Sequence, residues 1–354
     1  MAWKDHVRNV VPYTPGEQPE SKNIIKLNTN ENPYPPSNAV KQALHDLDTN
    51  DLRLYPSPKA TDLVKALADY YHVEEDNVFV GVGSDDVIGM AFLTFFNSSK
   101  PILFPDISYS FYSVWADLYQ IPYERPALDE NFKLKKEDYY KENGGIIIPN
   151  PNAPTAIYEE LANIEDIISH NRDVVVMIDE AYIDFGGKSA LSLVSKYDNL
   201  LVIQTYSKSR SMAGMRIGYA IGNKELIQYL NAVKNSYNSY TMNAPSIIAG
   251  VASLQDKPYF ESTVDRVIKT RERVKKQMKE IGFLFTDSLA NFLFASHKMI
   301  PARELFEELR EKNIYVRYFD SARIDNYLRI SIGTDEEMDQ LLHELKKIVN
   351  KRGI

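Results

Sequence analysis

The sequence predicts an α/β protein with a mostly parallel sheet flanked by helices, a smaller α+β domain and an N-terminal arm. Short, wholly apolar segments alternate with helical segments between residues 78 and 221, as in a sheet that is buried on both faces. After residue 255 the pattern changes to strands and charged amphipathic helices. The first part of the chain is rich in proline, asparagine and glutamate, which is typical of an extended segment.

Composition excludes several classes of function. The chain has 354 residues, 44% hydrophobic and 25% charged, which is ordinary for a globular protein. Its net charge of -8 argues against nucleic acid or an anionic membrane surface as a partner. The absence of cysteine excludes disulfides, thiolate metal sites and a cysteine nucleophile. No segment has the apolar core of a signal peptide or of a membrane span, so a cytoplasmic location is expected.

The same changes of pattern predict the domain organisation. Residues 1–36 form an arm that must pack on the small domain or on a partner subunit. Residues 37–255 form the large domain, and residues 256–354 form the small one. Helices are expected at 38–47, within 54–73, and at 87–96, 109–118, 159–170, 256–282, 303–312 and 335–349. Strands are expected at 78–82, 101–104, 146–148, 174–178, 200–204 and 217–221, and within 283–287, 291–296, 313–319 and 327–333.

Polar turns follow the apolar strands that end near Val82, Ile148, Ile178 and Gln204. In a parallel α/β sheet, ligands bind at the carboxyl ends of the strands. These separated stretches are therefore expected to converge on one edge of the sheet.

The first of these turns, GVGSDD at residues 81–86, is neither a dinucleotide fingerprint nor a Walker A loop. Its glycines would let the backbone approach a ligand. Ser84 would cap a helix whose free N–H groups could hold a phosphate, although a plain capped helix explains the pattern as well. Asp85 and Asp86 would repel a phosphate, so binding requires their side chains to turn away and a cation to lie nearby.

The later turns carry groups with complementary chemistry. Lys208 is either a solvated loop cation or a lysine that forms a Schiff base. Asp179 either caps a loop or pairs with a protonated ring nitrogen, and the phenol of Tyr182 could donate to a ring oxygen. Arg216 supplies a cation, and Tyr109 either stacks on a ring or belongs to the core. A lysine for an aldehyde, an acid for a pyridinium and a cation for a phosphate are together what pyridoxal phosphate needs.

A series of motifs in order then resembles the fold-type-I pyridoxal-phosphate-dependent aminotransferases over almost the whole chain. They are LNTNENPYPPS, LYPSP, GVGSDD, SYSFY, PNPNAPT, DEAYIDF, YSKSRSMAGMRIGY, IYVRYF and LRISIGT. The resemblance implies that Lys208 carries the cofactor pyridoxal 5′-phosphate, with Asp179 on the ring nitrogen, Tyr182 on the ring hydroxyl and Tyr109 stacked on the ring.

The resemblance also implies the rest of the site. The cofactor phosphate would be held by Ser84, Asp85, Ser207 and Arg216. Tyr55 would reach that phosphate from the other subunit of a homodimer, with the active site at the interface. The anions of small-molecule substrates would be bound by Arg317, Arg329 and Tyr13, with Asn30 near them.

Two departures from the family pattern affect this expectation. The family usually has two consecutive asparagines in the PNPNAPT turn, but here Asn152 is followed by Ala153. We expect Asn152 to take over the bond to the ring hydroxyl that the second asparagine usually makes. GVGSDD also differs from the usual G-N-G-S-D-E, but it changes side chains more than backbone, so phosphate binding is expected to survive.

The reaction implied by the resemblance is transamination between L-histidinol phosphate and 2-oxoglutarate, in histidine biosynthesis. An aromatic amino-acid transaminase is the main alternative on the same scaffold, followed by a threonine-phosphate decarboxylase. A non-catalytic, cofactor-binding regulator would need a DNA-binding domain ahead of the arm. A nicotinamide dehydrogenase would need a third glycine that residue 86 does not supply.

Overall fold

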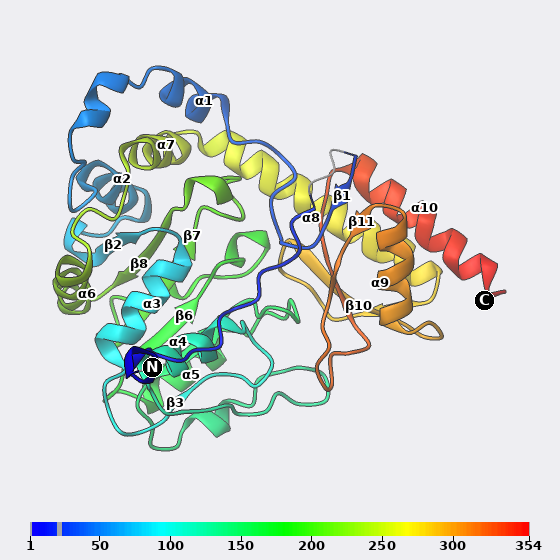
Figure 1. Ribbon diagram of the computed structural model, residues 1–354, viewed down its shortest axis with the longest axis horizontal. Coiled ribbons are helices and arrows are strands. Elements are labelled where there is room, and N and C mark those ends of the chain that lie inside the picture. The colour runs from blue at the N-terminus through cyan, green and yellow to red at the C-terminus, as the bar shows by residue number, and fades with distance from the viewer. Residues whose placement is uncertain (1, 20–22, 354) are drawn as a thin grey trace.

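The computed structural model of the protein describes residues 2–19 and 23–353, so residues 1 and 20–22 of the predicted arm lie outside the described part. Figure 1 shows a larger body built around a central sheet and a smaller one that contains the C-terminus. The long helix α8 (Lys257–Glu280) runs between them. No helix in the described part is long and apolar enough to cross a membrane.

The larger body contains a seven-stranded sheet in the order β2-β8-β7-β6-β5-β3-β4. The strands are β2 (Val78–Gly81), β3 (Ile102–Leu103), β4 (Tyr123–Glu124), β5 (Ile146–Pro149), β6 (Val176–Asp179), β7 (Leu200–Thr205) and β8 (Gly218–Gly222). Neighbouring strands from β4 to β7 are parallel, whereas β8 is antiparallel to both of its neighbours. The predicted mostly parallel sheet is confirmed. Because β8 is antiparallel to both β2 and β7, these two strands run in the same direction as each other. The carboxyl ends of β2, β5, β6 and β7 therefore lie at the same edge of the sheet.

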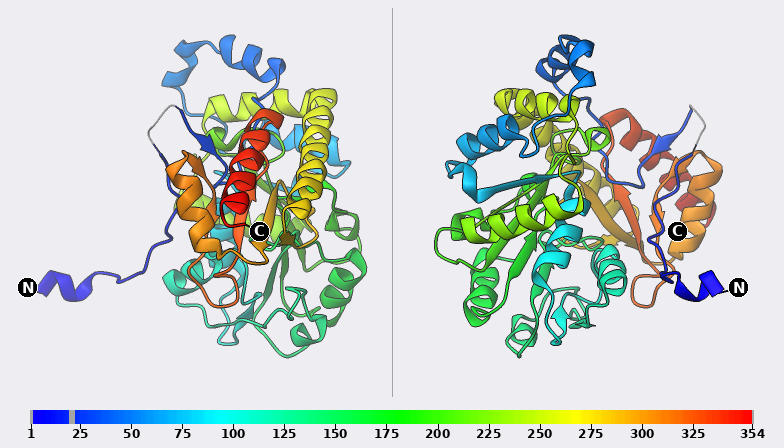
Figure 2. Two further views of the ribbon diagram at one scale, coloured as in Figure 1. Left: turned by 90° about the vertical axis from the view of Figure 1, so that its right-hand side faces the viewer. Right: turned by 60° about the vertical axis from the view of Figure 1, so that its left-hand side comes forward.

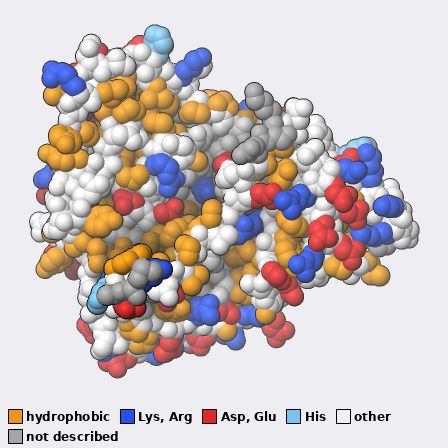
Figure 3. Space-filling view, viewed as in Figure 1, with side chains coloured by type: hydrophobic (Ala, Val, Ile, Leu, Met, Phe, Trp, Pro, Cys, Tyr) orange, Lys and Arg blue, Asp and Glu red, His pale blue; other side chains and the backbone are white. Residues whose placement is uncertain are grey.

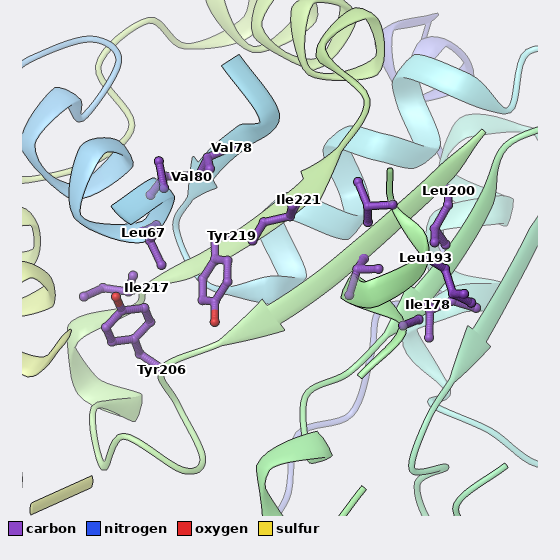
Figure 4. Close-up of a cluster of buried hydrophobic side chains, with 14 of the residues drawn as sticks. Leu67, Val78, Val80, Ile178, Leu193, Leu200, Tyr206, Ile217, Tyr219 and Ile221 are labelled. Atoms are coloured by element: carbon purple, nitrogen blue, oxygen red, sulfur yellow. The ribbon is translucent and has the colours of Figure 1, made fainter. Parts of the chain in front are cut away.

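Helices cover both faces of this sheet, because alternate residues of each strand point to opposite sides. One face packs on α1 (Asn38–His45), α2 (Thr61–Tyr71), α5 (Leu161–His170) and α7 (Ala244–Gln255). The other packs on α3 (Ser84–Phe95), α4 (Phe111–Tyr119) and α6 (Lys224–Tyr237). Figure 4 shows part of the first core, where Leu67 of α2 lies beside Tyr206 and Tyr219. No element was predicted for the stretch that forms α6 and α7.

The smaller body is an antiparallel sheet covered by helices. Its strands, in the order β12-β13-β10-β9, form a four-stranded sheet. They are β9 (Phe283–Phe285), β10 (Phe292–His297), β12 (Arg317–Tyr318) and β13 (Leu328–Ser331), and the helices besides α8 are α9 (Ala302–Glu311) and α10 (Asp335–Lys351). The architecture changes where α8 begins, close to the predicted boundary, although the domain limits themselves stay a prediction.

The N-terminal arm joins the smaller body through a two-stranded parallel pairing of β1 (Ile25–Lys26) with β11 (Ile314–Tyr315). Leu27, the next residue, is buried in the core of that body. The 3-10 helix Ala2–His6 projects away from both bodies (Figure 2), and it leaves Trp3 65% exposed. On the face shown in Figure 3, apolar side chains gather over the arm and the larger body, whereas charged ones dominate the smaller body.

Candidate active site

A cavity of about 490 Å³ opens at the sheet edge where the polar turns meet, and the arm and the smaller body complete its walls. Most of the residues singled out in the sequence line it. They are Tyr13, Asn30, Ser84, Asp85, Tyr109, Asp179, Tyr182, Ser207, Lys208, Arg216, Arg317 and Arg329. The expected convergence of separated stretches on one edge is therefore confirmed.

Asp179 is the last residue of β6 and is buried, 6% exposed, at one wall of the cavity. Its Oδ2 accepts a hydrogen bond from the Tyr112 hydroxyl at 2.7 Å and its Oδ1 accepts one from the Ala181 N–H at 3.2 Å. Burial raises the pKa of Asp179 to about 6 despite these bonds. No cation of the described chain forms an ion pair with it, so this carboxylate would be stabilised by a protonated ligand group.

Tyr112 was not recognised from the sequence as a site residue. It is fully buried in α4, and burial and the adjacent Asp179 raise the pKa of its phenol well above the usual value. It therefore stays a neutral donor that fixes the direction of the carboxylate. A signal was present in the sequence, because Tyr112 ends the SYSFY motif and stands three residues after Tyr109. Tyr109 itself precedes α4, so the contact between the two rings depends on the turn before the helix.

Lys208 lies on the loop after β7 and points its Nζ into the cavity. The Nζ donates to the Thr29 carbonyl at 3.2 Å and lies 5.7 Å from the centre of the Tyr182 ring. No carboxylate lies within ion-pair distance of this nitrogen among the described residues. An amine on a rigid loop without an ion-pair partner is free to act on a ligand.

Tyr182 is held in place by Asn30 of the arm, whose Nδ2 donates to the Tyr182 hydroxyl at 3.0 Å. The orientation of Asn30 is itself fixed by Ser331. Asn30 Oδ1 accepts a hydrogen bond from the Ser331 hydroxyl at 3.0 Å, and the backbone N–H of Asn30 donates to Ser331 Oγ at 2.8 Å. Asn30 therefore positions the phenol as well as lining the cavity. Ser331, on β13, was not recognised in the sequence.

A second corner of the cavity is suited to an anion. Helix α3 begins at Ser84, and the first N–H groups of a helix have no partners within it. The Arg216 guanidinium lies beside this helix start, 3.5 Å from the Ser207 hydroxyl. Gly83 has a φ of 85°, and a Cβ there would stand 2.5 Å from Arg216 Nη2, so only glycine allows this approach. The prediction that Ser84 caps the helix is wrong, because Gly83 occupies the cap position and makes no side-chain bond.

The two acidic residues of this turn behave differently. Asp86 turns back toward the strand and accepts from the Val82 N–H at 2.9 Å, as phosphate binding required. Asp85 instead faces the cavity, where it accepts from the Tyr109 hydroxyl at 3.0 Å and lies 3.5 Å from Arg216 Nη2. Tyr109 thus forms part of the wall through a polar contact as well as its ring.

Arg317 and Arg329 are directly opposite each other on the neighbouring antiparallel strands β12 and β13. Like charges in this arrangement destabilise a sheet. Burial, together with the charge of Arg317, lowers the pKa of Arg329, and the buried Nε of Arg329 has no hydrogen-bond partner among the described residues. Both arginines line the cavity. The pair is therefore suited to an anionic group.

The structure does not bring Asn152 to the cavity wall, which corrects the role expected for it. Its Nδ2 donates to the Ile107 carbonyl at 3.0 Å and to the Thr155 hydroxyl at 2.9 Å, so the amide stabilises its own loop. Asn150 likewise exchanges two hydrogen bonds with the backbone of Glu159. Ala153, which stands where the family has its second asparagine, lines the cavity without offering a polar group.

Tyr55 also lies outside the cavity of its own chain. It is 80% exposed and stacks on Tyr240 with ring centres 4.5 Å apart. Leu52 and Leu54 beside it are also more than half exposed. An exposed apolar patch of this kind is typical of an interaction surface.

Glu180, next to Asp179, is a buried carboxylate that does not line the cavity. Its oxygens accept from the Ala190 N–H at 2.6 Å, the Ser189 hydroxyl at 2.6 Å and Gln204 Nε2 at 2.8 Å. Burial raises the pKa of Glu180 to about 7 despite these bonds. The residue ties the loop after β6 to β7 behind the site.

We expect the Glu180→Gln substitution to remove part of the pH dependence of stability. The folded-state pKa of about 7 lies above the ordinary value of 4.5, so the stabilisation from Glu180 is complete below the ordinary value and is lost as the pH rises to about 7. The loss is on the order of 3 kcal/mol. About 2 kcal/mol of this loss falls between pH 5 and pH 7, where denaturant unfolding measures it. The free energy of unfolding should fall more in the wild type than in the variant; parallel falls would contradict the assignment.

The fold and this arrangement of lysine, buried acid and arginines define a transaminase. The chain belongs to the class I and II aminotransferase family, whose family model matches residues 22–345. It is 50% identical to the histidinol-phosphate aminotransferase of Clostridium beijerinckii, over 98% of this chain and 97% of the relative. It is also 50% identical to that of Lactococcus lactis subsp. cremoris, over 99% of both chains.

Solved structures support the fold. The histidinol-phosphate aminotransferase of Clostridium acetobutylicum superposes with a TM-score of 0.85 at 24% identity, covering 93% of this chain and 100% of that one. The enzyme from Sinorhizobium meliloti, solved in complex with pyridoxal-5′-phosphate, gives 0.84 at 21% identity, covering 93% of this chain and 91% of that one. The family resemblance noted in the sequence is confirmed.

Proposed function

We propose that this transaminase uses pyridoxal 5′-phosphate to transfer an amino group between L-histidinol phosphate and 2-oxoglutarate, giving imidazole acetol phosphate and L-glutamate. The reaction belongs to histidine biosynthesis, and its expected location is the cytoplasm. The observation that carries the proposal is the opposed pair Arg317 and Arg329 in the same cavity as Lys208. The names of the curated relatives support the choice of substrate.

The residues present fit the cofactor. A protonated ring nitrogen would relieve the burial of the Asp179 carboxylate, whose pKa is raised to about 6 in its absence. Arg216, Ser207 and the start of α3 would hold the phosphate. When bound, pyridoxal phosphate supplies an aldehyde that takes the substrate amine and a ring that accepts the electron pair left at the substrate Cα.

The protein side chains then have separate tasks. Lys208 Nζ would carry the aldehyde at rest and, once displaced, take the proton from the substrate Cα. The Asp179 carboxylate, directed by Tyr112, would hold a proton at the ring nitrogen. Tyr182, directed by Asn30, would donate its hydroxyl to the ring oxygen. The ring oxygen would therefore have Tyr182 as a hydrogen-bond donor, although Asn152 does not line the cavity.

The arginine pair would serve both substrates in turn. The phosphate of histidinol phosphate and a carboxylate of glutamate are each anions that a guanidinium can bind through two hydrogen bonds. Tyr13 of the arm lies near this position and stacks on Phe111 with ring centres 4.6 Å apart. The arm would therefore close one side of the substrate site.

We further propose a homodimer with the active site at its interface. Tyr55 would reach the cofactor phosphate of the other subunit, which accounts for an aromatic side chain that is exposed in its own chain. The patch of Leu52, Leu54, Tyr55 and Tyr240 and the projecting N-terminal helix would be covered by the second copy. An interface of the usual size would bury these apolar groups.

A turnover assay tests the proposed reaction. With 2-oxoglutarate as acceptor, we expect kcat/KM for histidinol phosphate to exceed that for phenylalanine or tyrosine at least about tenfold, because only the phosphate is a dianion for the arginine pair. A preference for phenylalanine or tyrosine would indicate an aromatic amino-acid transaminase. Release of carbon dioxide from threonine phosphate would indicate the decarboxylase alternative.

A further inference from the structure

Three carboxylates line the active-site cavity, and the proposed mechanism uses two of them at most. They are Glu31, Asp85 and Asp179. Asp179 and Asp85 each accept hydrogen bonds on both oxygens. Glu31 differs, because Lys26 and Thr29 both donate to its Oε2, the latter at 2.5 Å, while its Oε1 accepts no hydrogen bond from any described residue.

Glu31 is held ionised at the cavity wall. Burial acts to raise the pKa of its carboxyl group, but the hydrogen bonds from Lys26 and Thr29 and the charge of Lys26 outweigh it, so the pKa lies below the usual value. The charge of Lys208 acts in the same direction. Both residues line the cavity, and the Thr29 backbone links them, since its carbonyl accepts from Lys208 Nζ.

A purely structural role explains this arrangement poorly. The Lys26–Glu31 ion pair is partly exposed, with 43% of the Glu31 side chain accessible. Ion pairs of this kind contribute little to stability. An ionised carboxylate in the cavity would also repel the phosphate or carboxylate of a substrate. This cost is avoided if the carboxylate faces a part of the substrate that donates a hydrogen bond.

Resting on the proposed function, we propose that Glu31 is a specificity-determining residue whose free Oε1 accepts a hydrogen bond from the imidazole N–H of the amino donor. The three polar parts of histidinol phosphate then have separate partners in the cavity. The phosphate meets Arg317 and Arg329, the amine meets the position of Lys208, and the imidazole meets Glu31. Among the described residues of the arm that line the cavity, Glu31 is the one that carries a negative charge at neutral pH.

This assignment predicts opposite effects on the two amino donors. Histidinol phosphate carries a ring N–H, whereas glutamate carries a second carboxylate that has no N–H to donate and is repelled by the charge of Glu31. The imidazole ring has an N–H in either protonation state, so a carboxylate binds it and discriminates against the second carboxylate of glutamate. A side chain that only held the arm in place would affect both donors alike.

The experiment compares the holoenzyme with its Glu31→Gln variant, measuring KM and kcat for each amino donor in separate half-reactions. We expect KM for histidinol phosphate to rise about tenfold, equivalent to about 1.4 kcal/mol, with kcat nearly unchanged. KM for glutamate should stay the same or fall. Equal losses with both donors, or no change with histidinol phosphate, would overturn the proposal.

Glu17→Gln serves as the matched control, because Glu17 is also a glutamate of the arm in a partly exposed ion pair, with Arg310, but does not line the cavity. It should keep the wild-type preference for histidinol phosphate; the same phenotype as Glu31→Gln would show a structural role and overturn the proposal. If Glu31→Gln does not fold, Glu31→Asp withdraws the charge from the cavity by one methylene and should show the same selective loss. Failure of wild-type turnover with histidinol phosphate would instead refute the proposed function.

Discussion

Replacing Lys208 by alanine should lower the rate of amino transfer by at least about 10³-fold. The amine of Lys208 is the only lysine nitrogen among the described residues that lines the cavity, and it has no ion-pair partner there. Its removal takes away the group that carries the aldehyde and the base that takes the substrate proton. Steady-state turnover with histidinol phosphate and 2-oxoglutarate measures the effect.

The same variant should still take up pyridoxal phosphate, because Arg216, Ser207 and Asp179 are untouched. Cofactor content after gel filtration is therefore the second measurement. Lys224→Ala, at the exposed start of α6, is a matched control that should retain normal turnover. A Lys208→Ala enzyme with near-normal turnover would rule out the role given to this residue.

The Asp179→Asn variant should lose about 10²–10³ in kcat. Asparagine keeps the shape of the side chain and an acceptor for Tyr112, but it has no charge to hold a proton at the ring nitrogen. Stopped-flow measurement of each half-reaction locates the loss in the chemical step. Asp173→Asn, which changes an exposed acid on the loop that precedes β6, is the control for removal of a charge.

Stability separates this effect from misfolding. The carboxylate is buried without a cation, and burial raises its pKa to about 6, so ionisation costs stability at neutral pH. The cofactor-free Asp179→Asn protein should therefore be at least as resistant to denaturant at neutral pH as the cofactor-free wild type. A variant that is less stable but catalytically normal would contradict the catalytic role of Asp179 and show that the residue is structural.

The fold was largely predictable because its strands are apolar on both sides. The segments at 146–148, 174–178 and 200–204 contain no polar residue facing solvent, apart from their ends, and the structure places them at the centre of the sheet. The antiparallel direction of β8 was not predictable, since a short apolar strand carries no signal of its direction. The stretch that forms α6 and α7 was left unassigned.

The candidate site was predictable where a single residue type carries the chemistry. Lys208, Asp179 and Arg216 each stand directly after or before an apolar strand, so topology alone brings them together. Ser84 was wrongly expected to cap α3, because Gly83 takes the cap position. The need for glycine there depends on how closely Arg216 approaches, and that distance is set by tertiary packing.

Residues from distant parts of the chain were harder to place. Asn152 was expected at the cofactor ring, but the sequence does not show that its amide is used by Ile107 and Thr155. Glu31 was passed over because a glutamate between two asparagines looks like an ordinary turn residue. Its free oxygen becomes visible only when the arm is seen beside Lys208.

The most direct test of whether Lys208 carries the cofactor is borohydride reduction of the protein purified with pyridoxal phosphate. Peptide mapping by mass spectrometry follows the reduction. Reduction makes the bond between the cofactor and its lysine permanent, so the modified residue can be identified. We expect a pyridoxyl group on the peptide that contains Lys208 and on no other peptide. A protein that takes up no pyridoxal phosphate, or that carries the group on another lysine, would contradict this expectation.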